Sequence, residues 1–163
     1  MSTIVSILMG SKSDWPIMEH AHQILDQFSI PHESRILSAH RTPEALQSYI
    51  KEAEKKGVNI FIAGAGGAAH LPGVIASQTV MPVIGVPIQT QALNGMDSLF
   101  SIVQMPSGIP VATMAVGKAG AINAGLLAVS ILACRHAHYR EALQHYRETQ
   151  ATKLLEQSNP LEV

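Results

Sequence analysis

Short apolar runs rich in β-branched residues alternate along this chain with segments whose apolar residues recur every three or four positions. The runs suit buried strands and the periodic segments suit amphipathic helices, so the alternation predicts an α/β fold with a parallel sheet and right-handed crossovers. Five such strands fit the order 2-1-3-4-5 of a doubly wound sheet. The expected strands are 3–9, a more polar edge strand at 30–37, 60–63, 83–86 and 111–116.

Local start and stop signals predict the helices. Pro16 suits the first turn of a helix that begins at Asp14 or Trp15, and Gly57 ends a second helix opened by Thr42-Pro43-Glu44. Further helices are expected around 95–103, over 118–135, and as an additional C-terminal helix over 139–157. No repeat, low-complexity tract or linker interrupts the 163 residues, so we predict a single domain spanning 1–163.

Charge and hydropathy exclude several classes of function. The formal net charge is −1 without a Lys/Arg cluster, which argues against a nucleic-acid partner. The longest apolar run covers only 124–134, whereas a membrane span needs about twenty residues. No signal-peptide pattern opens the chain, so we expect a soluble cytoplasmic protein. The single Cys134 permits no intrachain disulfide, and its apolar helical setting predicts that its thiol is buried.

The low charge content points to self-association. Charged residues make up 14% of the chain, against about 25% in typical domains, while hydrophobic residues reach 47%. Too few charges are available to cover the surface of a free domain of this size. We therefore expect a homo-oligomer with closed symmetry.

Two loops that follow expected strands carry anion-binding groups. In a sheet of this order, ligands lie beyond the carboxyl ends of the strands, where the loops after strands one, two and three meet. The loop 10–14 offers backbone N–H groups, the hydroxyls of Ser11 and Ser13, and a helix N-terminus, which suit one phosphate. An ordinary Ser-rich turn is the alternative. Asp14 is either a helix cap or an acceptor for sugar hydroxyls, and Arg41 in the loop 38–43 offers a planar fork of donors for phosphate or carboxylate.

Proton transfer and close approach to the backbone are suggested by two further features. His40, beside Arg41, carries an imidazole that exchanges protons near neutral pH. The stretch 63–73 is so rich in Gly and Ala that a small ligand can lie against its backbone, and His70 near its end is a second polar group or a loop anchor. Lys118, in a short glycine-containing segment, either reaches an anion or only marks helix–strand packing.

The other histidines show no metal-binding pattern. His20 and His22 are two positions apart on a helix, so they face apart, and His136, His138 and His145 suit surface positions. No His-Glu-x-x-His, Cys-x-x-Cys or carboxylate-rich cluster occurs. We predict neither a metal nor a cofactor.

Taken together, these motifs resemble one family. Their order and spacing are similar to those of the class I N5-carboxyaminoimidazole ribonucleotide mutases of bacterial purine biosynthesis, also called the catalytic subunit of phosphoribosylaminoimidazole carboxylase. Class II members, which carboxylate aminoimidazole ribonucleotide directly with CO2, typically have Lys at the position of Arg41 and Arg-Ser-Asn in place of the glycine-rich loop. The terminal helix matches poorly, and Asn94 stands where the family has Ser. The matching stretches are Met9–Trp15, Ser38–Pro43, Ala63–Gly73, Gly85–Pro87, Asp97–Leu99, Gln104–Pro106, and Gly117–Ala121 with Asn123.

The resemblance implies a fold, an assembly and a reaction. It implies a flavodoxin-like three-layer sandwich, a homo-octamer with active sites at subunit contacts, and an isomerase that moves a carboxylate from the exocyclic N5 to ring carbon C4 without cofactor, metal or ATP. Functional coupling to the ATP-dependent synthetase that makes the substrate is also implied. Ser11, Ser13 and Arg41 would hold the 5′-phosphate, and Asp14 the ribose. The other implied site residues are His40 and His70 as catalytic groups and Ser38, Ala39, Gly66, Gly67, Ala68 and Leu71 as substrate contacts.

Three alternatives stay open at this point. A class II carboxylase would use aminoimidazole ribonucleotide and CO2 directly. A flavodoxin-like electron carrier would share the fold, but aromatic residues, which usually stack on flavins, are only 4% of the chain. A non-catalytic receiver-like module would need acidic residues after the first strand, where this chain has Ser11-Lys12-Ser13.

Overall fold

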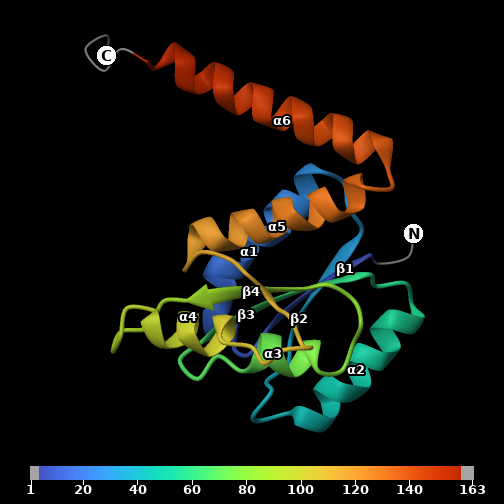
Figure 1. The fold of residues 1–163 in the computed structure, drawn as a ribbon, viewed down its shortest axis with the longest axis vertical. Coiled ribbons are helices and arrows are strands. Elements are labelled where there is room, and N and C mark those ends of the chain that lie inside the picture. The colour runs from blue at the N-terminus through green and yellow to red at the C-terminus, as the bar shows by residue number, and fades with distance from the viewer. Residues whose placement is uncertain (1–3, 159–163) are drawn as a thin grey trace. The chain divides into compact units, whose positions relative to one another are not determined.

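A five-stranded parallel sheet forms the centre of the computed structural model, which describes residues 4–158 (Figure 1). The strand order is β2-β1-β3-β4-β5, and every neighbouring pair is parallel. This confirms the predicted fold class and strand order. The strands are β1 Val5–Met9, β2 His32–Ile36, β3 Ile60–Gly66, β4 Val83–Ile88 and β5 Ala112–Thr113.

Burial follows the position of each strand in the sheet. β1 pairs with both β2 and β3, and all of its residues are buried, as expected of a central strand with both faces covered. β2 lies at an edge, as its polar sequence predicted, and none of its residues is fully buried. Thr3, with which the first predicted strand began, lies outside the described residues.

β5 is much shorter than the predicted strand 111–116. Its ladder with β4 pairs only Ala112 and Thr113, although the amides of Met114 and Gly117 still donate to the β4 carbonyls of Gly85 and Pro87, both at 2.8 Å. Gly117 has a φ of 77°, in the left-handed region, which turns the chain out of the strand direction. The content of β-branched residues alone therefore predicted a longer edge strand than the structure contains.

Residues 4–158 contain six α-helices and one 3-10 turn, of which α5 and α6 follow the last strand and the others connect strands. Asp14 precedes α1 and Gly57, with a φ of 102°, follows α2, so both predicted boundaries are confirmed. The elements are the 3-10 turn η1 Lys12–Asp14, α1 Trp15–Gln27, α2 Pro43–Lys55, α3 Leu71–Ala76, α4 Met96–Val103, α5 Lys118–Ala133 and α6 Ala137–Glu156. No helix within residues 4–158 combines the length and apolar character that a membrane crossing requires.

The core lies on both faces of the sheet. On one face, a cluster of buried side chains from the strands, α2, α3 and α4 includes Leu8, Leu46, Phe61, Ile75 and Ile102. On the other face α1 packs so closely that a Cβ added at Gly64 of β3 would overlap the side chain of Met18. Helices on both faces of a parallel sheet give the three-layer, flavodoxin-like arrangement that the resemblance implied (Figure 1).

The chain divides into two compact units, Met1–Leu126 and Leu127–Val163. The first holds the sheet and the helices up to the start of α5, and the second holds the rest of α5 and α6. A single domain over 1–163 stays a prediction.

Within the second unit, α6 buries Tyr139 and Leu143 near its start, whereas Leu154 near its end is 71% exposed, so the predicted apolar side of this helix is covered only at its beginning. The prediction that Cys134 is buried is wrong. It follows the last residue of α5, and its exposed Sγ donates to the Ser130 carbonyl at 3.5 Å.

Candidate active site

A cleft of about 430 Å³ opens at the carboxyl ends of β1, β2, β3 and β4. The loops after these strands supply its walls, as the sheet order predicted for the first three. The structure brings every predicted site residue into its lining. These residues are Ser11, Ser13, Asp14, Ser38, Ala39, His40, Arg41, Gly66, Gly67, Ala68, His70 and Leu71.

The first wall is a hydrogen-bonded turn. Ser11 caps η1, since its Oγ accepts from the Ser13 amide at 3.3 Å and from the Ser13 hydroxyl at 3.0 Å. Asp14 completes a capping box by accepting from the Ser11 amide at 3.0 Å. Burial raises the pKa of the Asp14 carboxyl above its ordinary value, although the amides of Ser11 and Gly10 and the charge of Arg41 act in the opposite direction. Asp14 thus stands at the N-cap position of α1 without a side-chain cap bond there, and its carboxyl supports the Ser11 cap of η1 at the lining of the cleft.

Arg41 links the loops that follow β1 and β2. One terminal guanidinium nitrogen donates to the Gly10 carbonyl at 2.7 Å, and Nε donates to the Ser38 hydroxyl at 3.4 Å. The loop itself is held by Thr42, whose hydroxyl accepts from the Ser38 amide at 2.9 Å and donates to the Ser38 carbonyl at 3.0 Å. The exposed guanidinium is thus fixed at the same wall as Ser11 and Ser13, where these donors can hold one phosphate.

His40 and His70 meet across the cleft although they lie 30 positions apart in the chain. His40 Nε2 and His70 Nδ1 are 2.8 Å apart, and the two rings are nearly perpendicular, at 76°. At this distance one nitrogen donates and the other accepts, so both cannot carry a proton there at once. The two imidazoles therefore form one proton-exchanging unit exposed to the cleft.

The glycine-rich wall is fixed from behind by α4. β3 extends to Gly66, beyond the predicted end at Ala63, and Gly67 follows with a φ of 68°. The Gly67 amide donates to Ser98 Oγ at 2.9 Å, and the same hydroxyl donates to the Ile88 carbonyl at 2.6 Å. Ser98 is fully buried, so its hydroxyl serves these two backbone groups and not the solvent.

Sequence reasoning missed the role of Ser98 and the contribution of β4. Ser98 lies in Asp97–Leu99, one of the stretches that resemble the family, but the sequence analysis gave it no role. The signal that could have found it is a small polar residue among the apolar residues of α4. Ile88, Gln89 and Thr90 also line the cleft, because β4 runs to Ile88 and not only to Val86 as predicted. The same sheet-order argument applied to the fourth strand would have found them.

A larger hollow of about 840 Å³ lies elsewhere and does not suit the same chemistry. It is lined mainly by residues 76–83 and 108–112, at the amino ends of β4 and β5, with Glu54 as its one charged side chain. It offers no cation for a phosphate and no pair of titratable groups. Size alone therefore does not identify the site.

Comparison with known proteins identifies the family of this chain. A family model described as AIR carboxylase matches residues 4–153. The chain belongs to the AIR carboxylase family. The match of the family model extends past Asn123, the last matching residue in the sequence analysis, and into α6.

Several AIR carboxylase relatives are similar over nearly their whole length. The chain is 54% identical over 160 residues to the N5-carboxyaminoimidazole ribonucleotide mutase of Pseudomonas aeruginosa, with 98% of each chain covered. It is 53% identical over 161 residues to the mutase of the same name from Bacillus subtilis, with 99% of each covered. The crystal structure of Treponema denticola PurE superposes with a TM-score of 0.88 at 31% identity, covering 98% of this chain and 99% of that one.

For two residues of this AIR carboxylase family member, the structure adds to what the motifs alone suggested. Lys118, the first residue of α5, is exposed and does not line the cleft, so the packing interpretation of its glycine-containing segment is favoured. Asn94, where the resemblance led us to expect Ser, adopts a φ of 52°. Asn is enriched in this left-handed conformation, so the residue suits its local backbone.

Proposed function

We propose that the chain converts N5-carboxyaminoimidazole ribonucleotide into 4-carboxy-5-aminoimidazole ribonucleotide in de novo purine biosynthesis. Relatives that carry the name N5-carboxyaminoimidazole ribonucleotide mutase, at 52% to 55% identity, support this reaction. The single observation that carries it is the His40–His70 pair, joined at 2.8 Å in a cleft that also holds a fixed guanidinium and a glycine-rich wall. Such a site unites proton transfer with binding of a small anion.

The substrate's phosphate binds at one end of the cleft. Ser11, Ser13 and Arg41 donate to the 5′-phosphate, and the Asp14 carboxylate accepts from the ribose hydroxyls. The aminoimidazole then extends between the loop that carries His40 and the glycine-rich wall. The remaining contacts are made by Ser38, Ala39, Gly66, Gly67, Ala68 and Leu71.

The reaction balances with one recycled proton. Protonated His40 gives its proton to the exocyclic nitrogen while the N–C bond of the carbamate breaks, which releases CO2 and the free amine. Ring carbon C4 attacks the CO2 and forms the new C–C bond, and His40 then accepts the C4 proton, so that the aromatic ring is restored. His70 bonds the imidazole that cycles between these states. Backbone and methyl groups of Gly67, Ala68 and Leu71 confine the CO2 between the two steps.

The direct carboxylase is the alternative reaction, and one assay separates the two. Purified protein is given either N5-carboxyaminoimidazole ribonucleotide or aminoimidazole ribonucleotide with bicarbonate, and formation of the common product is followed. We expect efficient turnover of the carbamate without added bicarbonate, in agreement with Arg41 and the sequence 66–70. Turnover restricted to the second mixture would overturn the mutase assignment.

Assembly and cellular context belong to the same proposal. The 14% charge content and an apolar row on α4, where Met96, Phe100 and Val103 are 51%, 55% and 46% exposed, support a homo-octamer with sites near subunit contacts. The cytoplasm is the expected location. The instability of a carbamate substrate also supports functional coupling to the ATP-dependent synthetase that makes it.

A further inference from the structure

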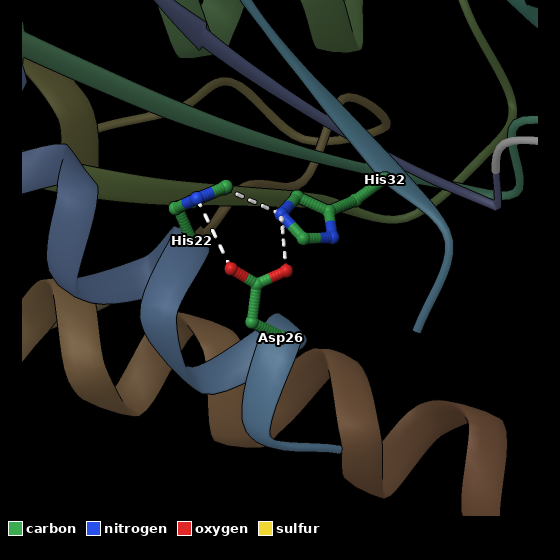
Figure 2. A group of neighbouring side chains, drawn as sticks. All are labelled: His22, Asp26 and His32. Carbon is green, nitrogen blue, oxygen red and sulfur yellow. Dashed lines mark hydrogen bonds and ion pairs between the residues drawn. The ribbon is translucent and has the colours of Figure 1, made fainter. Parts of the chain in front are cut away.

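Three potential metal ligands lie together outside the cleft. His22 and Asp26 are one turn apart on α1, and His32, ten positions after His22, is the first residue of β2 (Figure 2). Their ligand atoms all lie within 4.8 Å of one another, and no other group of three such residues occurs within residues 4–158. The sequence analysis compared His22 only with His20 on the same helix and missed this group, because His32 comes from another element.

The hydrogen bonds around His32 assign its tautomer. His32 Nδ1 lies 2.7 Å from the Ile30 carbonyl, which can only accept, so Nδ1 carries a proton and, in the neutral ring, Nε2 presents a lone pair. The His32 side chain is only 5% exposed, so this orientation is held by its surroundings. A backbone carbonyl that orients an imidazole in this way is the usual support of a metal-ligating histidine.

The same reasoning continues to His22 and Asp26. His32 Nε2 accepts from His22 Nδ1 at 2.6 Å, which leaves His22 Nε2 facing the Asp26 carboxylate at 3.2 Å. In a neutral His22, that nitrogen would direct a lone pair at a carboxylate oxygen. The cluster is therefore electrostatically complete only with a cation on it, either one additional proton on the pair of imidazoles or a metal ion.

We propose that His22, Asp26 and His32 bind a divalent transition-metal ion such as Zn²⁺. Two imidazole nitrogens and one carboxylate oxygen form a three-ligand set with water in the fourth position, and this donor set favours Zn²⁺, Co²⁺ or Ni²⁺ over Mg²⁺ and Ca²⁺. Tetrahedral ligands lie about 3.3–3.5 Å apart. Asp26 lies 3.2 Å from His22 Nε2 and 3.9 Å from His32 Nε2, whereas the 2.6 Å contact between the two rings uses His22 Nδ1. The half-exposed His22 ring must therefore rotate to direct a single nitrogen at the metal ion.

The position of the site indicates a structural role. His32 begins β2, so the cluster lies at the amino end of this edge strand, whereas the cleft lies at the carboxyl ends of the strands. A bound metal ion would join α1 to β2 without contact with the substrate. The proposal is thus independent of the mutase reaction.

Trp15 provides the readout, because it is the only tryptophan and its ring centroid lies 5.6 Å from that of His22. Full-length protein freed of metal with a chelator is titrated with Co²⁺, while visible absorption and tryptophan fluorescence are recorded. We expect one Co²⁺ per chain to quench Trp15, Zn²⁺ to reverse the quenching, and Mg²⁺ to have no effect. At a Zn²⁺ concentration 100 times its Kd, the ratio of folded to unfolded protein should rise about 100-fold and the Tm with it.

Matched variants assign the effect to the cluster. His22→Ala and Asp26→Ala, both at exposed or half-exposed positions, should weaken Co²⁺ binding by at least about 10- to 100-fold, the loss that even a displaced supporting group causes. His20→Ala removes a neighbouring imidazole on α1, bonded to Gln23 at 3.2 Å, and should bind Co²⁺ normally. Asp26→Ala should keep full mutase activity, which separates this test from that of the proposed function.

Two outcomes would overturn the metal site. Absence of quenching would leave the cluster as a hydrogen-bonded network that holds a proton. Quenching or Tm stabilisation that persists unchanged in His22→Ala and Asp26→Ala would place the metal on other groups, such as the exposed imidazoles of the cleft.

Discussion

At the scale of single residues, the proposed proton transfer in the cleft depends on which of its two imidazoles carries the proton. Since Nε2 of His40 and Nδ1 of His70 are 2.8 Å apart, each protonation of one nitrogen fixes the other as an acceptor. In the proposed reaction His40 gives up and regains one proton, while His70 is its hydrogen-bond partner. The two histidines have different tasks under this arrangement, and substitution separates them.

Replacing His40 by Asn should abolish most turnover while the protein still folds and binds substrate. Asparagine retains polarity and approximate size but cannot carry a proton through the reaction, and one general acid–base group contributes about 10²–10⁴-fold. The kcat should fall by at least this factor, measured by product formation with KM determined in parallel. His136→Asn, at an exposed position outside the cleft, is the matched control. A variant with more than about a tenth of native kcat would transfer the role to His70, because that loss falls short of the 10²–10⁴ range.

Replacing Arg41 by Ala should mainly weaken substrate binding. In the proposed binding mode the guanidinium contacts a phosphate that does not change during the reaction, so its loss affects the ground and transition states alike. A charge-assisted contact of this kind accounts for roughly one to two decades in KM, with kcat nearly unchanged. Arg147→Ala, which removes an exposed arginine outside the cleft, controls for the change in net charge. A large fall in kcat at constant KM would be incompatible with the phosphate role.

At the scale of elements, α4 holds the glycine-rich wall mainly through the buried hydroxyl of Ser98. Ser98→Ala leaves the Gly67 amide and the Ile88 carbonyl without this partner. Unsatisfied buried polar groups cost about 1–3 kcal/mol, so the free energy of unfolding in urea should fall by this amount. Ser101→Ala should cost less, because that partly buried hydroxyl donates at 2.7 Å to the Asp97 carbonyl of its own helix and only at 3.3 Å to the Gly67 carbonyl. Equal losses in both variants would argue against a specific role of Ser98.

A second inter-element contact joins β1 to α2 and is sensitive to alkaline pH. The Tyr49 hydroxyl lies 2.6 Å from Ser6 Oγ and donates to Glu33 at 2.9 Å, and burial first, then Glu33, raises the pKa of Tyr49 from 10.0 to about 12. The folded protein thus keeps a proton that the unfolded chain loses above pH 10. This stabilisation is complete below pH 10 and disappears as the pH rises toward 12.

The free energy of unfolding should therefore fall more steeply between pH 10 and 12 in the native protein than in Tyr49→Phe. Denaturant titrations at several pH values in this range measure the difference. Tyr146→Phe serves as the control for removal of a phenol, and parallel slopes for native protein and Tyr49→Phe would contradict the assignment.

Element boundaries show which signals in the sequence are local. The start of α1 at Trp15 and the end of α2 before Gly57 were predicted because Pro16 and Gly57 act through their own backbone conformations. The end of β3 was not, since Gly64 and Gly66 have little β-propensity and enter the ladder only because β4 lies alongside. The cluster of His22, Asp26 and His32 was missed for the same reason: its members meet through tertiary packing and have no motif spacing.

At the scale of the whole molecule, the apolar row on α4 leads to a prediction about assembly. Met96, Phe100 and Val103 recur at helical spacing and are exposed in the single chain. We expect a mass well above that of the monomer in light scattering at micromolar concentration. Phe100→Asp should shift the distribution toward smaller species, because it places a charge in a desolvated contact. A native protein that scatters as a monomer would refute both the octamer and the shared sites.

The close approach of β3 to α1 also limits how this sequence can diverge. Gly64 leaves no space for a methyl group beside Met18, whereas Gly67 has open space but a φ of 68°. Replacement of Gly64 by a larger residue is therefore tolerated only when Met18 is replaced by a smaller residue in the same lineage. Second-site suppressors of Gly64→Ala should arise at Met18. Gly67→Ala has no such suppressor, because its strain lies in its own backbone.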